Sequence, residues 1–193
     1  ESRMGVRDTV QPQLMGGLIL VGSFQNGKPS FLSLGDLASL PMTVRIDRPG
    51  HLEQDYQTAM QVAKASGGTP DTMLSQRYYL ADAAFLVALE GEKEFLSTLH
   101  TALANPVWPL FLGRKSYVAS PPIYLPNGLI EQTALEALSR IEWPQDVEDC
   151  ELIIEVGDDE EGLIKRDVPL CFTKRKRRFT TRKVRRIKLR RPD

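Results

Sequence analysis

Two strand-like runs separated by a long polar stretch constrain the fold more than any other feature of the sequence. Residues 42–48 alternate, with Val44 and Ile46 on one face and charged residues on the other, which predicts a half-buried strand that ends at a Pro-Gly turn. Residues 83–89 are apolar throughout and predict a buried strand. Roughly 20 residues after the turn show no core face, and loops of that length are usually functional or disordered. The pattern therefore predicts a long hairpin or excursion that leaves the domain.

The remaining apolar periodicity predicts a mixed α and β chain. Helices are expected at about 36–40, 92–104 and 129–141, and further strands at 152–156, 163–171 and 182–189. A chain of 193 residues can build one domain with a real core. This order of elements is typical of an α+β sandwich. A ferredoxin-like βαββαβ core fits the pattern if its first strand lies before Glu1.

The formal net charge of zero hides a strong segregation of charge. Residues 174–191 contain twelve basic residues and no acid, whereas residues 142–161 contain ten acids. The basic segment also carries Phe179, Val184 and Ile187, so it can pack against a core as well as bind phosphate. We favour a polyanion-binding strip. The alternative is a solvated tail that pairs with the acids of its own domain.

The residues that usually build catalytic or metal sites do not come together in this sequence. Cys150 and Cys171 stand alone, which predicts no zinc site and no disulfide framework, but reduced thiols in the cytoplasm. His100 flanks the apolar face of a predicted helix and is interpreted as structural. The acids 158–161 lie between two glycines and predict a solvated turn. We therefore expect no metal, no cofactor and no catalytic residue.

The segment Gly113-Arg114-Lys115-Ser116 has the residue types that bind phosphate. It is not a nucleotide-binding P-loop, because Pro109 occupies the place of the first glycine and Arg114 precedes the lysine. Glycine permits close backbone approach, arginine offers a bidentate fork and lysine a point charge. These four residues are predicted to contact a phosphate.

A second candidate set places arginines beside tyrosines, which is the combination that single-stranded RNA requires. Bases stack on aromatic rings or guanidinium planes while cations hold the phosphates. The set comprises Arg45, Arg48, Arg77, Tyr78 and Tyr79. The alternative for either tyrosine is a core ring with its hydroxyl at the surface.

Several segments, taken in order along the chain, resemble the CasD family. They are residues 2–9, 44–50, 55–59, 75–91 and 111–122, followed by the basic ending. The similarity of any one segment is weak evidence, whereas the similarity of the whole set, in this order, is specific. CasD is the subunit of the type I-E CRISPR surveillance complex, Cascade, that holds the 5′ handle of the crRNA.

The resemblance implies the ferredoxin-like, RRM-type fold of the repeat-associated RNA-binding (RAMP) superfamily. Residues 1–193 would form one such domain, with a β-hairpin thumb inserted within residues 47–76 and the basic strip at 174–191. The family opens with a hydrophobic strand that these residues do not contain, so the first core strand is expected to be absent from this chain.

The resemblance also implies a non-catalytic function in antiviral defence. The expected partners are the crRNA 5′ handle, the CasC backbone that the subunit caps, the Cascade large subunit, and target DNA through the complex, with no membrane. The expected RNA-binding residues are Ser2, Arg3, Arg7, Arg45, Arg48, Gln76, Arg77, Tyr78, Gly113, Arg114, Lys115, Ser116, Arg178 and Arg182. The expected functional residues of the thumb are Asp55, Tyr56 and Thr58.

Two other functions compete with this interpretation. The first is a metal-independent endoribonuclease that processes precursor crRNA, as in type I-C relatives. Such cleavage needs a base for the 2′-hydroxyl and an acid for the leaving oxygen. Candidate groups are His51, Tyr56, Tyr78, Tyr79 and Lys115, but no spacing sets them together. The second, a generic basic-tailed ribosomal or DNA-binding protein, explains the basic ending alone.

Overall fold

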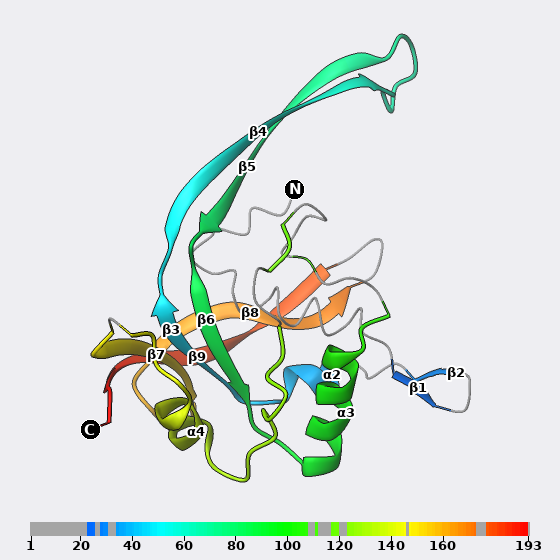
Figure 1. The fold of residues 1–193 in the computed structure, drawn as a ribbon. Helices are drawn as coiled ribbons and strands as arrows, with labels where there is room; N and C mark the ends of the chain where they lie inside the picture. The colour runs from blue at the N-terminus through cyan, green and yellow to red at the C-terminus, as the bar shows by residue number, and fades with distance from the viewer. Residues whose placement is uncertain are drawn as a thin grey trace.

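The fold is α+β and is built around a compact body from which one hairpin projects (Figure 1). The computed structural model describes residues 23–25, 28–30, 34–107, 111, 117–119, 123–145, 147–172 and 177–192. Its elements in chain order are β1 (Ser23–Gln25), β2 (Lys28–Ser30), α2 (Leu34–Ala38), β3 (Met42–Arg48), β4 (His51–Val62), β5 (Asp71–Ala81), β6 (Ala84–Leu89), α3 (Lys93–Ala104), α4 (Ala134–Arg140), β7 (Asp149–Val156), β8 (Leu163–Phe172) and β9 (Arg177–Arg190).

The body is organised by a five-stranded sheet with strand order β6-β3-β7-β9-β8. All neighbouring strands in it are antiparallel. Helix α4 packs against β3 and β6, and α2 packs against β8. This arrangement confirms the predicted ferredoxin-like α+β class. It also puts β9, the most basic segment of the chain, in the interior of the sheet between β7 and β8.

One cluster of the apolar core is formed by α2, the turn that follows it, and α3. Leu37, Leu40 and Leu99 are buried, and they pack with half-buried residues of β6 and α3. The helical spacing that predicted α3 is the spacing of these core contacts. His100 lies beside Leu99 on α3, and its Nε2 atom is 2.8 Å from the carbonyl oxygen of Leu125. This contact supports the structural interpretation of His100.

Helix α4 begins five residues later than the sequence predicted. Thr133 is its N-cap: the Thr133 hydroxyl accepts a hydrogen bond from the Glu136 N–H, and the Thr133 N–H donates to the Glu136 carboxylate. A reciprocal capping box of this kind satisfies two backbone donors and fixes the helix start. Leu129 and Ile130 are 48% and 40% exposed, so their apolar character gives no core face. The predicted helix start at residue 129 is therefore wrong.

The projecting hairpin consists of β4, β5 and residues 63–70, and we call it the arm. It continues the antiparallel pairing of β3 with β6, since Arg48 pairs with Ala84 and His51 pairs with Ala81. Gly50 has a φ of +68° at the root of the arm, where a Cβ atom would lie 2.5 Å from the Ala81 oxygen. A side chain there would clash with backbone, so this turn requires glycine.

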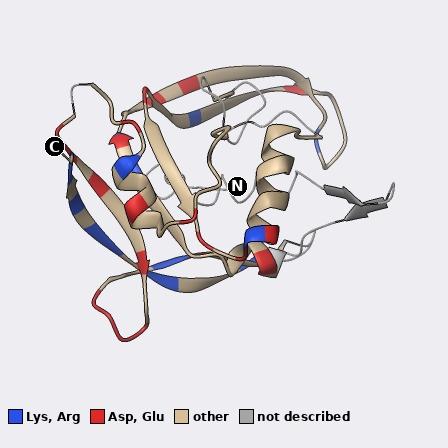
Figure 2. Cartoon of the chain, turned by 60° about the horizontal axis from the view of Figure 1, so that its bottom comes forward, with Lys and Arg blue, Asp and Glu red and all other residues tan. Residues whose placement is uncertain are grey.

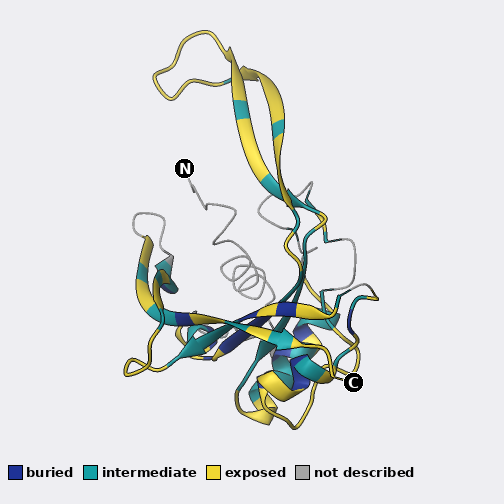
Figure 3. Cartoon of the chain, turned by 90° about the vertical axis from the view of Figure 1, so that its left-hand side faces the viewer, coloured by how far each residue is buried: buried dark blue, intermediate teal, exposed yellow. Residues whose placement is uncertain are grey.

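The arm lies where the sequence predicted an excursion from the domain, and it extends beyond residue 76, the predicted end of the thumb. Strand β5 runs on to Ala81, because its last residues pair with the first residues of β4. Most of the arm is exposed to solvent (Figure 3). Among the described residues, no helix is long and apolar enough to cross a membrane.

Candidate nucleic-acid interface

The two faces of the arm differ in chemistry. Because side chains alternate along paired strands, one face carries only uncharged residues. This uncharged face consists of Leu52, Gln54, Tyr56 and Thr58 from β4 and of Leu74, Gln76, Tyr78 and Leu80 from β5. Leu52, Tyr56, Leu74 and Tyr78 are each between 56% and 59% exposed. The arm thus presents an apolar, amide-bearing surface that no described residue covers.

The opposite, charged face of the arm includes Glu53, Asp55 and Arg77. Gln76 and Tyr78 therefore point away from the side on which Arg77 lies, and Tyr56 and Thr58 away from the side of Asp55. The predicted thumb and RNA-binding residues are thereby divided into two surfaces. One of these suits phosphates, and the other suits bases or a protein.

Tyr117 connects the body of the protein to the charged face of the arm. Its ring stacks on Tyr79, with centroids 5.1 Å apart and an interplanar angle of 28°. Its hydroxyl donates a hydrogen bond of 3.0 Å to Asp55 Oδ2. Arg77 lies directly across the strands from Asp55, is exposed, and makes no ion pair within the described part of the chain.

Arg45 is inside the fold and does not form the surface contact that the sequence suggested. Its side chain is 1% exposed and its Nε atom lies 2.6 Å from Asp47 Oδ1. The guanidinium also donates to the carbonyl oxygens of Leu138, Ile141 and Glu142, at and after the end of α4. The Leu138 carbonyl is one that the helix end leaves without an intrahelical partner, and the other two follow the helix directly. The prediction that Arg45 binds RNA is corrected for this reason.

The Arg45 cluster also includes Trp143, whose ring centroid lies 5.1 Å from the guanidinium carbon of Arg45. The Trp143 indole N–H donates to the Ser139 carbonyl oxygen at 2.8 Å. Together these contacts fasten α4 to β3. The function of Arg45 is thus to hold the helix on the sheet.

Arg182 is likewise used within the sheet. Its Nε and Nη2 atoms donate to the two carboxylate oxygens of Asp167 at 2.8 and 2.7 Å, and Glu155 lies 3.7 Å from its Nη1 atom. The Arg182 side chain is 8% exposed. A bidentate pair at this depth joins β8 to β9, so the predicted RNA contact by Arg182 is also corrected.

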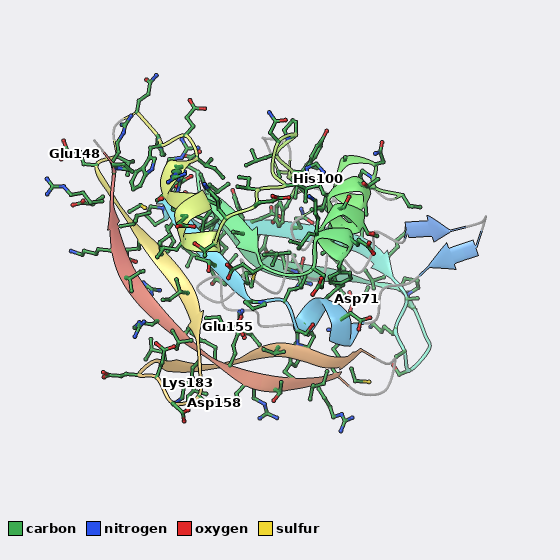
Figure 4. All side chains as sticks on the ribbon, turned by 90° about the horizontal axis from the view of Figure 1, so that it is seen from below. Asp71, His100, Glu148, Glu155, Asp158 and Lys183 are labelled. Carbon is green, nitrogen blue, oxygen red and sulfur yellow. The ribbon has the colours of Figure 1, made fainter. Side chains whose placement is uncertain are left out.

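The neighbouring cations of β9 pair with the acids of the same domain. Lys183 donates to the carbonyl oxygens of Asp158 and Glu160 in the β7–β8 turn, where Figure 4 shows Lys183 beside Asp158. Arg185 lies 3.3 Å from the Glu160 carboxylate and Arg186 lies 3.2 Å from that of Glu151. Figure 2 shows this acidic turn next to the basic strands. The alternative interpretation of the basic strip therefore holds for its middle part.

The beginning of β9 differs, because its cations have no acidic partner among the described residues. Arg177 and Arg178 are exposed and follow directly after the basic residues 174–176. Arg48, at the root of the arm, is also exposed and makes no ion pair there. The arm, the C-terminal end of β8 and the N-terminal end of β9 extend from the same side of the body (Figures 1 and 3). These arginines form the candidate interface for a polyanion.

Part of the predicted RNA-binding set lies outside the described residues. This part comprises Ser2, Arg3, Arg7, Gly113, Arg114, Lys115 and Ser116. The described interface instead adds Tyr117 and Arg177 to the prediction. No local pattern identifies Tyr117, since its contacts join residues 62 positions apart in the sequence.

The described residues include no group of three or more His, Cys, Asp or Glu side chains that could hold a metal ion. Both cysteines are free, and burial raises the pKa of the Cys150 thiol above its usual value. A thiol of this kind stays protonated and is a poor nucleophile.

Comparison with known proteins gives matches of two kinds. A family model described as CRISPR-associated protein (Cas_Cas5) matches residues 24–185. A solved structure titled "Crystal structure of Cas protein" is 39% identical, covers 99% of this chain and 88% of its own, and superposes with a TM-score of 0.71. A chain from a structure titled "CRISPR RNA-guided surveillance complex" is 28% identical, with 93% and 78% coverage and a TM-score of 0.71. Among curated proteins, no significant match is found.

Proposed function

This chain belongs to the CRISPR-associated Cas_Cas5 family, and we propose that it is a non-catalytic subunit of a type I-E surveillance complex. In this function it binds the 5′ handle of the crRNA and caps the CasC backbone. It also contacts the large subunit of the complex and meets target DNA through that complex, in the cytoplasm. The similarity to a chain of an RNA-guided surveillance complex supports the assembly part of this proposal.

The observation that carries the RNA-binding part is a set of arginines that have no acidic partner among the described residues. Arg48 and Arg77 belong to the arm and its root, and Arg177 and Arg178 to the start of β9. Exposed guanidinium groups bind phosphates through charge-assisted, bidentate hydrogen bonds. The cations in the middle of β9 are already neutralised by Asp167, Glu155, Glu160 and Glu151, as described above. RNA binding should therefore depend on which cations of residues 174–191 lack an acidic partner within the described part of the chain, and not on the total charge of this segment.

Replacing Arg177 and Arg178 together with alanine tests this distinction. The double variant should bind repeat-derived single-stranded RNA about tenfold more weakly at low salt, because two exposed ionic contacts of about 0.7 kcal/mol each are lost. The slope of log K against log salt should fall by about 0.7 for each lost phosphate contact. Filter binding over a salt series measures both quantities.

The matched control is Arg186→Ala, which removes one cation from the same strand. Arg186 is 59% exposed and is paired with Glu151. Its loss should change the salt slope less than the loss of Arg177 and Arg178, because the Glu151 carboxylate competes with phosphate for the Arg186 guanidinium. If both variants lose RNA affinity to the same extent for each cation removed, RNA binding depends only on the total charge of residues 174–191, and the proposed interface is wrong.

The arrangement of the candidate cleavage groups favours a binding subunit over an endoribonuclease. Tyr56 and Tyr78 lie on the uncharged face of the arm, whereas His51 and Tyr79 lie on the charged face. His51 contacts Glu53 at 3.2 Å, and Tyr79 stacks on Tyr117. Tyr56 and Tyr78 are thereby separated from His51 and Tyr79, and the last two, which share a face, are already engaged by Glu53 and Tyr117.

The purified protein should therefore leave precursor repeat RNA intact. We expect a single band of unchanged length after prolonged incubation without metal, as judged on a denaturing gel. A discrete product that disappears in the His51→Ala or Tyr79→Phe variant would establish the endoribonuclease function instead.

A further inference from the structure

Residues 125–131, which precede α4, form a loop that is fastened to α3, and we call it the pinned loop. At one end of the loop, the Nε2 atom of His100 on α3 lies 2.8 Å from the carbonyl oxygen of Leu125. At the other end, the Glu131 carboxylate pairs with Lys93 at the start of α3. These contacts fix the loop through polar groups and not through its apolar side chains.

The apolar side chains in and next to the pinned loop remain exposed. Leu125, Leu129 and Ile130 of the loop and Leu135 of α4 are between 40% and 48% exposed. A single exposed leucine is ordinary, whereas several apolar side chains grouped on the surface are typical of a protein-binding site. A loop that already has a fixed conformation also loses little conformational entropy when a partner covers it.

The acids near the pinned loop outnumber the bases. Residues 90–94 and 129–140 together contain five acids and two bases. Glu92 and Glu94, the neighbours in sequence of the lysine that pairs with the loop, are exposed and make no ion pair within the described part of the chain. Figure 2 shows acidic residues on α4 and at the start of α3. A surface of this charge repels nucleic acid and complements a basic protein surface.

The pinned loop is also remote from the surfaces proposed for the other partners. Figure 1 shows the arm extending from one end of the molecule, with α3 and α4 at the other end. The arginines proposed to bind RNA belong to the arm, its root and the start of β9, and the uncharged face of the arm suits a protein such as CasC. A second protein that covers the pinned loop therefore does not compete with either of them.

We propose that the pinned loop and the acids at the start of α3 form the docking surface for the large subunit of the complex, which meets them with a patch that is apolar at its centre and basic at its rim. This inference rests on the proposed function and deepens it, since it assigns one partner to one surface. The leucines and the isoleucine supply the buried contact, and the acids steer the encounter and fix its orientation.

The test uses the full chain assembled with CasC and crRNA, and measures binding of the purified large subunit by biolayer interferometry. Leu129→Ser/Ile130→Ser should weaken this binding about tenfold or more, because it removes apolar anchors of the interface. Both side chains are exposed, so the melting temperature and the association with CasC and crRNA should stay at their wild-type values. Glu92→Gln/Glu94→Gln should slow association at low salt and differ little from wild type at high salt, where screening already suppresses steering.

The matched control is Leu163→Ser/Ile164→Ser, which removes another pair of consecutive apolar residues, 62% and 68% exposed, on β8. This control should bind the large subunit like wild type. If it loses as much affinity as Leu129→Ser/Ile130→Ser, exposed apolar area alone explains the binding and the inference is overturned. The inference is also overturned if Leu129→Ser/Ile130→Ser binds the large subunit like wild type, or if this variant loses CasC in place of the large subunit.

The wild-type chain separates failure of the inference from failure of the proposed function. If it associates with neither crRNA nor CasC, the proposed function is wrong and the inference falls with it. If it assembles with both but does not bind the large subunit, the docking inference is overturned while RNA binding and capping of the CasC backbone stand. Loss of the large subunit alone in Leu129→Ser/Ile130→Ser supports the inference.

Discussion

Replacing Arg45 with methionine is expected to lower the free energy of unfolding by about 3–5 kcal/mol, the usual effect of removing one partner of a buried ion pair. The change leaves the Asp47 carboxylate, 16% exposed, without its cation. It also leaves the carbonyl oxygens of Leu138, Ile141 and Glu142 without their donor at the end of α4. Helix α4 should loosen from β3 first. A chain of this size should then melt about 10 °C below wild type.

Arg48→Met is the matched control, since it makes the same substitution three residues further along the same strand. Arg48 is exposed and has no ion pair in the described part of the chain, so its loss should change the unfolding free energy by less than about 0.5 kcal/mol. Thermal and urea denaturation followed by circular dichroism compare the two variants. If the Arg45→Met variant has the same melting temperature as wild type, the buried cluster does not hold α4 on the sheet.

The sequence predicted those elements whose signal is local. Strand β3 has the bounds that its alternation and the Pro-Gly turn indicated, and α3 begins within one residue of the predicted helix. Helix α4 was predicted too long, because its start depends on the capping box at Thr133 and not on apolar spacing. Strand β5 runs past residue 76, the predicted end of the thumb, because its last residues pair with the first residues of β4.

The candidate site was harder to predict, because burial of a charged residue depends on what packs against its strand. Alternation assigns Arg45 to the polar side of β3, but α4 covers that side, and its last carbonyls need donors. In the same way, Arg182 and Arg178 look equivalent in a basic run. The sheet order then places Arg182 next to Asp167, while Arg178 lies near the end of its strand. Neither outcome follows from residue type or spacing.

The uncharged face of the arm is the feature that best suits a protein partner. It exposes leucines and tyrosines without a single charge, which is the composition of the core of a protein interface and not of a phosphate-binding surface. A two-stranded hairpin is only marginally stable alone in water, so a partner that covers this face also stabilises the arm. In the proposed function this partner is the neighbouring CasC subunit.

Replacing Tyr56 and Leu74 together with alanine should therefore block assembly while leaving the subunit folded. Both side chains are 58% exposed, so their removal opens no cavity in the core. Buried tyrosines at the centre of an interface each contribute about 2 kcal/mol or more, so the loss should exceed about thirtyfold in affinity for the backbone subunit. Co-purification with tagged CasC, and size-exclusion chromatography of the reconstituted complex, measure this loss.

Met73→Ala is the matched control for the arm. Met73 is adjacent to Leu74 and is 56% exposed, but it lies on the opposite, charged face. The Met73→Ala variant should assemble like wild type if docking uses the uncharged face. RNA binding by the isolated Tyr56→Ala/Leu74→Ala variant should stay near the wild-type value, since the arginines of the interface remain. A variant that assembles normally but loses RNA would show that Tyr56 stacks on a base, and the uncharged face would then belong to the RNA site and not to a protein partner.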